Sequence, residues 1–208
     1  MHKAIKYLLS GNVLHVVGES GIGKTHFVQQ LCRHFHSRYY FKDGIYWIDV
    51  EQIRSGDKLR EEIRRLTGIS VGNLQKSSEQ RKNMLVVLDG IQRTLKHVEQ
   101  QHFVNWVDAM VATMRVSVVL VSRRDLSNFL RSHFKKLQTI ELLPHNEYEA
   151  ADMLIAYNSE LRHLETGQLS LHRTLELERE LINTGGIPSN IRLLSDLLKH
   201  KSFLEIDI

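Results

Sequence analysis

The segment of residues 18–25, Gly-Glu-Ser-Gly-Ile-Gly-Lys-Thr, constrains the fold of this chain most, because it fits the phosphate-loop pattern G-x-x-x-x-G-K-[ST] at every defined position. A short apolar run with β-branched residues, 12–17, precedes it and predicts a buried strand. Apolar residues at helical spacing follow it and predict a helix from residue 24 to about residue 35. Strand, loop and helix together predict an α/β fold, a parallel sheet flanked by helices.

The residue types explain how such a loop holds phosphate. Gly18, Gly21 and Gly23 permit backbone conformations closed to other residues, so successive N–H groups can point at phosphate oxygens. The helix that begins near Lys24 adds free N–H groups and the positive end of its dipole. Lys24 can reach the β and γ phosphates, and the Thr25 hydroxyl can ligate Mg²⁺. We therefore predict a nucleotide-binding site.

A second informative run covers residues 84–89, Met-Leu-Val-Val-Leu-Asp, which is nearly all apolar and ends in a carboxylate. It predicts a central parallel strand that delivers Asp89 to the edge of the sheet. Beside a phosphate loop, such a carboxylate helps to hold Mg²⁺ through its water shell. Because Gly90 follows directly, simple turn chemistry is the alternative. The pairing with the phosphate loop favours the metal role.

Two arginines, Arg123 and Arg124, follow a predicted buried strand at residues 116–121. Arginine carries a fixed charge on a planar fork that suits phosphate oxygens, so one of the two could report whether a γ-phosphate is present. The alternative is surface solubility or a local ion pair with Asp125.

The pattern of predicted elements changes near residue 145. Further strands are predicted at residues 44–50 and 137–142, and helices at 57–66, 97–114, 172–183 and 189–199. Residues 72–83 are polar and predict a loop or a ragged helix. Strands and helices alternate before residue 145 and helices alone follow, which predicts an α/β nucleotide-binding domain over 1–144 and a helical subdomain over 145–208.

Composition supports a folded intracellular protein. Hydrophobic residues make up 42% of the 208 residues, enough for a real core, and the formal net charge is +4. The positive residues are scattered among acidic ones, which disfavours nucleic acid as a partner. The single cysteine, Cys32, suits a reducing compartment and is expected to be a core thiol. With no apolar run long enough to cross a bilayer and no secretion signal, we expect a cytoplasmic protein.

Taken together, the motifs resemble the STAND class of P-loop NTPases, most closely the NB-ARC type found in apoptosis regulators and plant disease-resistance proteins. The resemblance covers nearly the whole chain. It rests on the phosphate loop, the aromatic strand at 44–48, the strand ending at Asp89, the arginine-bearing segment 119–124, the segment 140–144 that leads into a helix, and Gly186-Ile187-Pro188.

The resemblance implies roles for individual residues. Lys24 and Thr25 would bind phosphate and metal, Asp89 would support Mg²⁺, Arg124 would sense the terminal phosphate, and Pro188 would pack near the adenine of ATP or ADP. Arg124 is preferred to Arg123 because the family's sensor arginine takes the last position of the aligned triplet. The residues predicted to contact nucleotide are Gly18, Ser20, Gly21, Ile22, Gly23, Lys24, Thr25, His26 and Pro188.

The chain departs from the family pattern in two ways. The family often has a second acidic residue directly after the metal aspartate, and here that position is Gly90. Glycine cannot act as a base, so slow or absent hydrolysis is expected unless another group serves. The chain also stops about one helix after Pro188, so effector and sensor domains would lie on other parts of a longer protein.

Three functions remain open at this level. The first is a switch in which ADP holds a closed monomer and exchange for ATP permits self-association through the longer chain. The second is an AAA+-type ATPase that acts on nucleic acid or protein complexes. The third is an interaction module whose nucleotide is structural.

Overall fold

The computed structural model describes residues 2–53, 55–68, 83–92, 100–114, 116–158 and 171–200. The predictions for residues 72–82 and 97–99 lie outside these ranges. Contacts divide the chain into two compact units, one of residues up to 19 with 24–142, the other of residues 20–23 with those from 143 onward.

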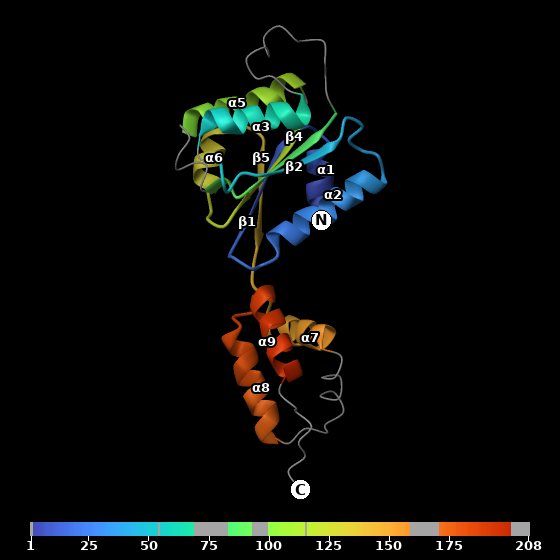
Figure 1. Cartoon of the computed structure of the whole chain (residues 1–208), viewed down its shortest axis with the longest axis vertical. Coiled ribbons are helices and arrows are strands. Elements are labelled where there is room, and N and C mark those ends of the chain that lie inside the picture. Colours follow the sequence, from blue (N-terminus) through green and yellow to red (C-terminus); the bar gives the residue numbers. More distant parts are fainter. Residues whose placement is uncertain are drawn as a thin grey trace. The chain divides into compact units, whose positions relative to one another are not determined.

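A parallel sheet forms the centre of the first unit (Figure 1). In the described part of the chain it has five strands, in the order β2-β3-β4-β1-β5. Their bounds are β1 Val13–Gly18, β2 Ile45–Asp49, β3 Leu85–Asp89, β4 Ser117–Ser122 and β5 Leu137–Leu142. Every pairing is parallel. The predicted fold class is confirmed, and each predicted strand lies within one residue of the observed one.

Both faces of the central strands are buried, which explains their continuous apolar runs. Along β3 and β4, alternate residues belong to two separate apolar clusters. Val86 and Val118 face one cluster, and Val87 and Val119 face the other. The sequences of these strands are therefore continuously hydrophobic and do not alternate between hydrophobic and polar residues.

Helices cover the two faces of this sheet (Figure 1). One face packs against α1 (His2–Leu8) and α2 (Lys24–Ser37), and the other against α3 (Gly56–Thr67), α5 (Gln100–Met114) and α6 (Ser127–His133). Sequence signals mark both ends of α3, because the Ser55 side chain accepts from the Lys58 N–H and Gly68 closes the helix in a left-handed conformation. The short helix α6 has no side-chain cap at Leu126, and sequence reasoning missed it.

The second unit contains the helices α7 (Glu147–Tyr157), α8 (Leu171–Asn183) and α9 (Pro188–His200). Its apolar core comprises Ala150, Leu154, Leu177, Ile191, Leu194 and Leu198. Asn146 and Glu149 form a reciprocal capping box at the start of α7. Among the described helices, none is long and apolar enough to cross a membrane.

Candidate functional site

The phosphate loop, residues 18–25, joins the end of β1 to the start of α2, as predicted. Gly21 and Gly23 have φ angles of 82° and 98°, which side-chain-bearing residues rarely adopt. Lys24 is only 8% exposed, and its Nζ donates to the backbone carbonyls of Gly18 (2.8 Å) and Glu19 (2.6 Å). Burial lowers the pKa of Lys24, the charge of Arg123 lowers it further, and Asp89 opposes both. The ammonium group thus lies at the loop, directed at its inner carbonyls.

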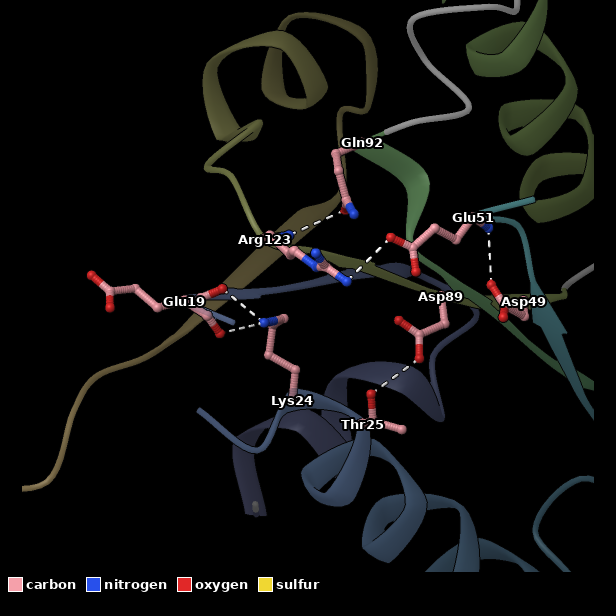
Figure 2. A network of polar contacts seen from close by, with 9 residues as sticks. Glu19, Lys24, Thr25, Asp49, Glu51, Asp89, Gln92 and Arg123 are labelled. Carbon is pink, nitrogen blue, oxygen red and sulfur yellow. Dashed lines mark hydrogen bonds and ion pairs between the residues drawn. The ribbon is translucent and has the colours of Figure 1, made fainter. Parts of the chain in front are cut away.

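Thr25, in the first turn of α2, meets Asp89, at the end of β3, although β4 lies between β1 and β3 in the sheet. The Thr25 hydroxyl donates to Asp89 Oδ2 at 3.2 Å (Figure 2). The pKa of Asp89 is raised above its ordinary value. Burial is the largest cause, the Thr25 hydrogen bond lowers the pKa, and the neighbouring carboxylates of Asp49 and Glu51 raise it. The structure therefore brings the two predicted metal-binding residues together at the carboxyl edge of the sheet.

This pair of side chains suits Mg²⁺. Hydroxyl and carboxylate oxygens are ligands that Mg²⁺ accepts, and it usually takes one or two protein groups together with phosphate oxygens and water. The described ranges contain no group of three or more His, Cys, Asp or Glu residues that could cage a metal alone. Thr25 and Asp89 would hold the ion together with phosphate oxygens, and its charge would stabilise the negative charge of the phosphates.

A second polar group lies at the ends of β2 and β4. The Arg123 guanidinium lies 3.2 Å from Glu51 Oε1, and the Arg123 backbone N–H donates to Gln92 Oε1 at 3.2 Å. The Glu51 backbone N–H in turn donates to Asp49 Oδ1 at 2.9 Å. Figure 2 shows Arg123 extending towards Glu51, with Asp89 nearby. We call the contact between the Arg123 guanidinium and Glu51 Oε1 the Glu51–Arg123 pair.

Gly90 allows the ends of β2 and β3 to approach closely. Its φ is 86°, and a Cβ added there would lie 2.9 Å from Glu51 Cβ and 3.3 Å from the Glu51 backbone nitrogen. Its N–H donates to the Val121 carbonyl at 3.1 Å, while the Val50 N–H donates to the Asp89 carbonyl at 2.9 Å. Position 90 therefore needs glycine for conformation and for space.

Of the two arginines, the structure brings Arg123 into this polar group. Arg124 is exposed, and its carbonyl accepts a hydrogen bond from the Ser122 hydroxyl at 2.6 Å. Because that hydroxyl donates its only hydrogen there, it accepts from Nε2 of the buried His15 at 2.8 Å. The sensor role of Arg124 stays a prediction. Sequence reasoning missed Glu51, Gln92 and His15, since nothing local distinguishes them.

The remaining predicted nucleotide contacts are spread over the loop, α2 and α9. Ser20 and His26 are exposed, Ile22 is buried, and Pro188 is half-buried as the first residue of α9. Their contacts with a nucleotide stay predictions. Cys32 is partly buried, and burial raises the pKa of its thiol to about 11, as expected of an inert packed thiol.

The family follows from a comparison with known protein families. The model of the NACHT domain matches residues 12–160, which include the phosphate loop, Asp89 and both arginines. The chain belongs to the NACHT family. This confirms the prediction of a nucleotide-binding P-loop NTPase, whereas the NB-ARC type within the STAND class stays a prediction. No curated protein sequence matches this NACHT chain significantly.

Solved structures share the fold of this NACHT chain at low sequence identity. C. elegans PCH-2 has a TM-score of 0.63 and 14% identity over 96% of this chain and 62% of its own. Aeropyrum pernix ORC1, in complex with DNA, has a TM-score of 0.63 and 16% sequence identity, and the match covers 95% of this chain and 59% of the ORC1 chain. The replication initiator DnaA, bound to AMPPCP and single-stranded DNA, has a TM-score of 0.55 and 20% sequence identity, and the match covers 97% of this chain and 60% of the DnaA chain. The chain thus spans about three fifths of each of these structures, and the likeness concerns the fold.

Proposed function

We propose that this NACHT chain is the nucleotide-binding core of a cytoplasmic regulatory switch of the STAND class, similar to NB-ARC proteins, which binds ADP or ATP with Mg²⁺. The observation that carries the proposal is the convergence of Lys24, Thr25 and Asp89 at one edge of the sheet. An ammonium group, a hydroxyl and a carboxylate in this arrangement can hold a phosphate chain and its cation. Residues 145–208 would form the helical subdomain, with Pro188 near the adenine.

A switch requires a ligand that has different affinities for two states. A γ-phosphate would add negative charge close to Lys24 and the arginines that follow β4, and ADP would not. Arg124 is the sensor by family resemblance, and Arg123 is the arginine whose charge acts on Lys24. Exchange of ADP for ATP would then permit self-association through effector and sensor domains of a longer protein. Because Gly90 follows Asp89, we propose that hydrolysis is slow.

The decisive experiment identifies the nucleotide that copurifies with the protein. The expected result is ADP or ATP, found by denaturing extraction and chromatography, together with a rise in melting temperature when ADP or ATP and Mg²⁺ are added. Protein that carries no nucleotide and melts at the same temperature with and without ADP and ATP would refute the proposal. GTP in the extract would refute the choice of adenine.

A second candidate function has one observation in its favour. Two of the structures with a similar fold, ORC1 and DnaA, are complexes with DNA, so an AAA+-type ATPase acting on nucleic acid is the alternative. It predicts steady ATP turnover that rises when DNA is added and is lost in Asp89→Asn. Turnover that is slow and insensitive to DNA would favour the switch.

A further inference from the structure

Positive charge is concentrated on the two helices that cover one face of the sheet, α1 and α2 (Figure 1). Neither helix contains an acidic residue, and Glu19 is the only one among residues 1–42. Lys3 and Lys6 on α1, Arg33 on α2 and Arg38 directly after α2 are all exposed. The mixture of charges along the sequence as a whole therefore does not hold for this surface. We call these four cations, together with Tyr39, the basic face.

No acidic side chain compensates these cations within the described ranges. None of the four forms an ion pair there with Asp or Glu. The Arg38 guanidinium instead donates to Nδ1 of His34 at 3.0 Å. The pKa of His34 is lowered by burial, by the charge of Arg38 and by His2 at the start of α1. Cationic groups of the two helices thus act on one another, which favours an anionic partner at this surface.

The basic face is distinct from the nucleotide site. The phosphate loop lies at the carboxyl edge of the sheet, and α2 runs back from it towards the amino edge. The segment after α2 contacts Asn83, which precedes β3: the Asn83 side chain donates to the Tyr40 carbonyl at 2.8 Å, and the Asp43 N–H donates to the Asn83 carbonyl at 3.1 Å. An anion bound near Arg38 would therefore not be the phosphate chain of the nucleotide.

Tyr39 presents an aromatic ring beside these charges. It ends α2 with a φ of 54°, a conformation usually left to glycine, and no other non-glycine residue in the described part of the chain has a positive φ. The Tyr39 and Tyr40 N–H groups donate to the carbonyls of His36 and Phe35, which closes the helix. Because the Tyr39 side chain is 81% exposed, packing does not explain why tyrosine stands there.

We propose that the basic face binds single-stranded nucleic acid, with its cations on the phosphates and the Tyr39 ring stacked on a base. This goes beyond the proposed nucleotide switch. Unpaired bases offer the faces that an exposed tyrosine can stack on, and a cationic surface with such a ring is how proteins hold single strands without reading their sequence. A bilayer fits less well, because α2, described along its whole length, exposes no large apolar side chain that could insert.

Reversal of charge tests the phosphate contacts. Fluorescence anisotropy with labelled 20-nucleotide single strands of DNA and of RNA, without ATP or ADP, should give a Kd of about 10 µM at 150 mM salt. The logarithm of the association constant should fall against the logarithm of the salt concentration with a slope of about −3. Arg33→Glu with Arg38→Glu should raise the Kd about 30-fold and halve this slope. Arg60→Glu with Arg64→Glu, an equal change of net charge on α3, is the control.

Tyr39→Gly tests the stacking and does not threaten the fold. Glycine suits the positive φ, so the melting temperature should be equal to that of the wild type or higher. The Kd for single strands should nevertheless rise about 10-fold, the usual effect of losing one stacked base. Tyr39→Phe, which keeps the ring, should bind like the wild type.

The other outcomes would overturn the proposal. Failure of the wild type to bind either single strand would do so, as would equal losses in the two charge reversals, which would show an effect of net charge alone. Equal affinity of Tyr39→Gly and wild type would exclude the stacking. Tighter binding to phosphatidylserine vesicles than to single strands, lost in the Arg33→Glu and Arg38→Glu variant, would assign the basic face to a membrane instead. A difference between the DNA and RNA strands would identify which of the two it prefers.

Discussion

The phosphate loop and the Glu51–Arg123 pair lie at the same edge of the sheet, but they are built in different ways. The loop is one continuous segment, and the backbone of Gly21 and Gly23 together with Lys24 defines it. The pair joins two residues from strands that are not neighbours, since β3 lies between β2 and β4. A local motif can be recognised from residue types, whereas the pair exists only because of the strand order. Variants in the loop and in the polar groups around it can test this contrast.

Lys24→Ala should remove most of the nucleotide affinity. The variant loses a charged donor at the phosphates, which is worth about 3 kcal/mol and corresponds to a Kd about 100-fold higher. Isothermal titration calorimetry with ADP and with ATP measures the Kd. Lys42→Ala is the matched control, because Lys42 is exposed. A Lys24→Ala variant with wild-type affinity would show that the loop does not bind the phosphates.

Gly90→Ala should destabilise the fold, because the close approach of β2 to β3 leaves no room for a methyl group. The positive φ and the contact with Glu51 should together cost about 2 kcal/mol and lower the melting temperature by about 5 °C. Gly185→Ala is the control, since Gly185 also has a positive φ, 60°, but a Cβ there meets nothing within 4 Å. An equally large loss in the control would assign the effect to backbone strain alone.

Acid should weaken the fold through His15, which holds the turn that follows β4. Burial lowers the pKa of His15 to about 4, from 6.5 in the unfolded chain, and nearby Asp125 opposes this only in part. The unfolded state therefore binds the proton more readily, and stability present above pH 6.5 is lost as the pH falls towards 4. Between pH 7 and pH 5 the loss from this group is on the order of 2 kcal/mol.

Urea unfolding of His15→Gln across this pH range isolates the contribution. Glutamine can still donate to the Ser122 hydroxyl and does not titrate, so the difference between wild type and variant should shrink with acid. Parallel pH profiles would show that other groups cause the acid sensitivity. His36→Gln is a suitable control, because His36 is exposed.

Asp89→Asn should have the smallest effect, confined to the part of ATP affinity that depends on Mg²⁺. Asparagine keeps an oxygen near Thr25 but loses the charge that attracts the cation, so affinity with Mg²⁺ should fall about 10-fold, or 1.4 kcal/mol. Affinity measured in EDTA should be unchanged. An equal loss with and without Mg²⁺ would indicate that Asp89 supports the loop rather than the metal.

Sequence reasoning found the parts of the site that depend on local pattern. The glycine spacing identified the loop, and the apolar run identified β3 and its terminal Asp89, because buried parallel strands are hydrophobic on both faces. It gave no signal for Glu51, an ordinary charged residue just after a strand, or for His15 within β1. Their importance comes from neighbours distant in sequence, Arg123 and Ser122.

The sequence alone determined that this chain has a phosphate loop on a parallel sheet, because backbone freedom at glycines and the burial of strands are properties of short segments. Only the tertiary structure decided which side chains surround that loop. The order β2-β3-β4-β1-β5 inserts the later strand β4 between β1 and β3, which brings Arg123 near Lys24 and opposite Glu51. Strand order depends on the packing of the whole sheet, and no single segment encodes it.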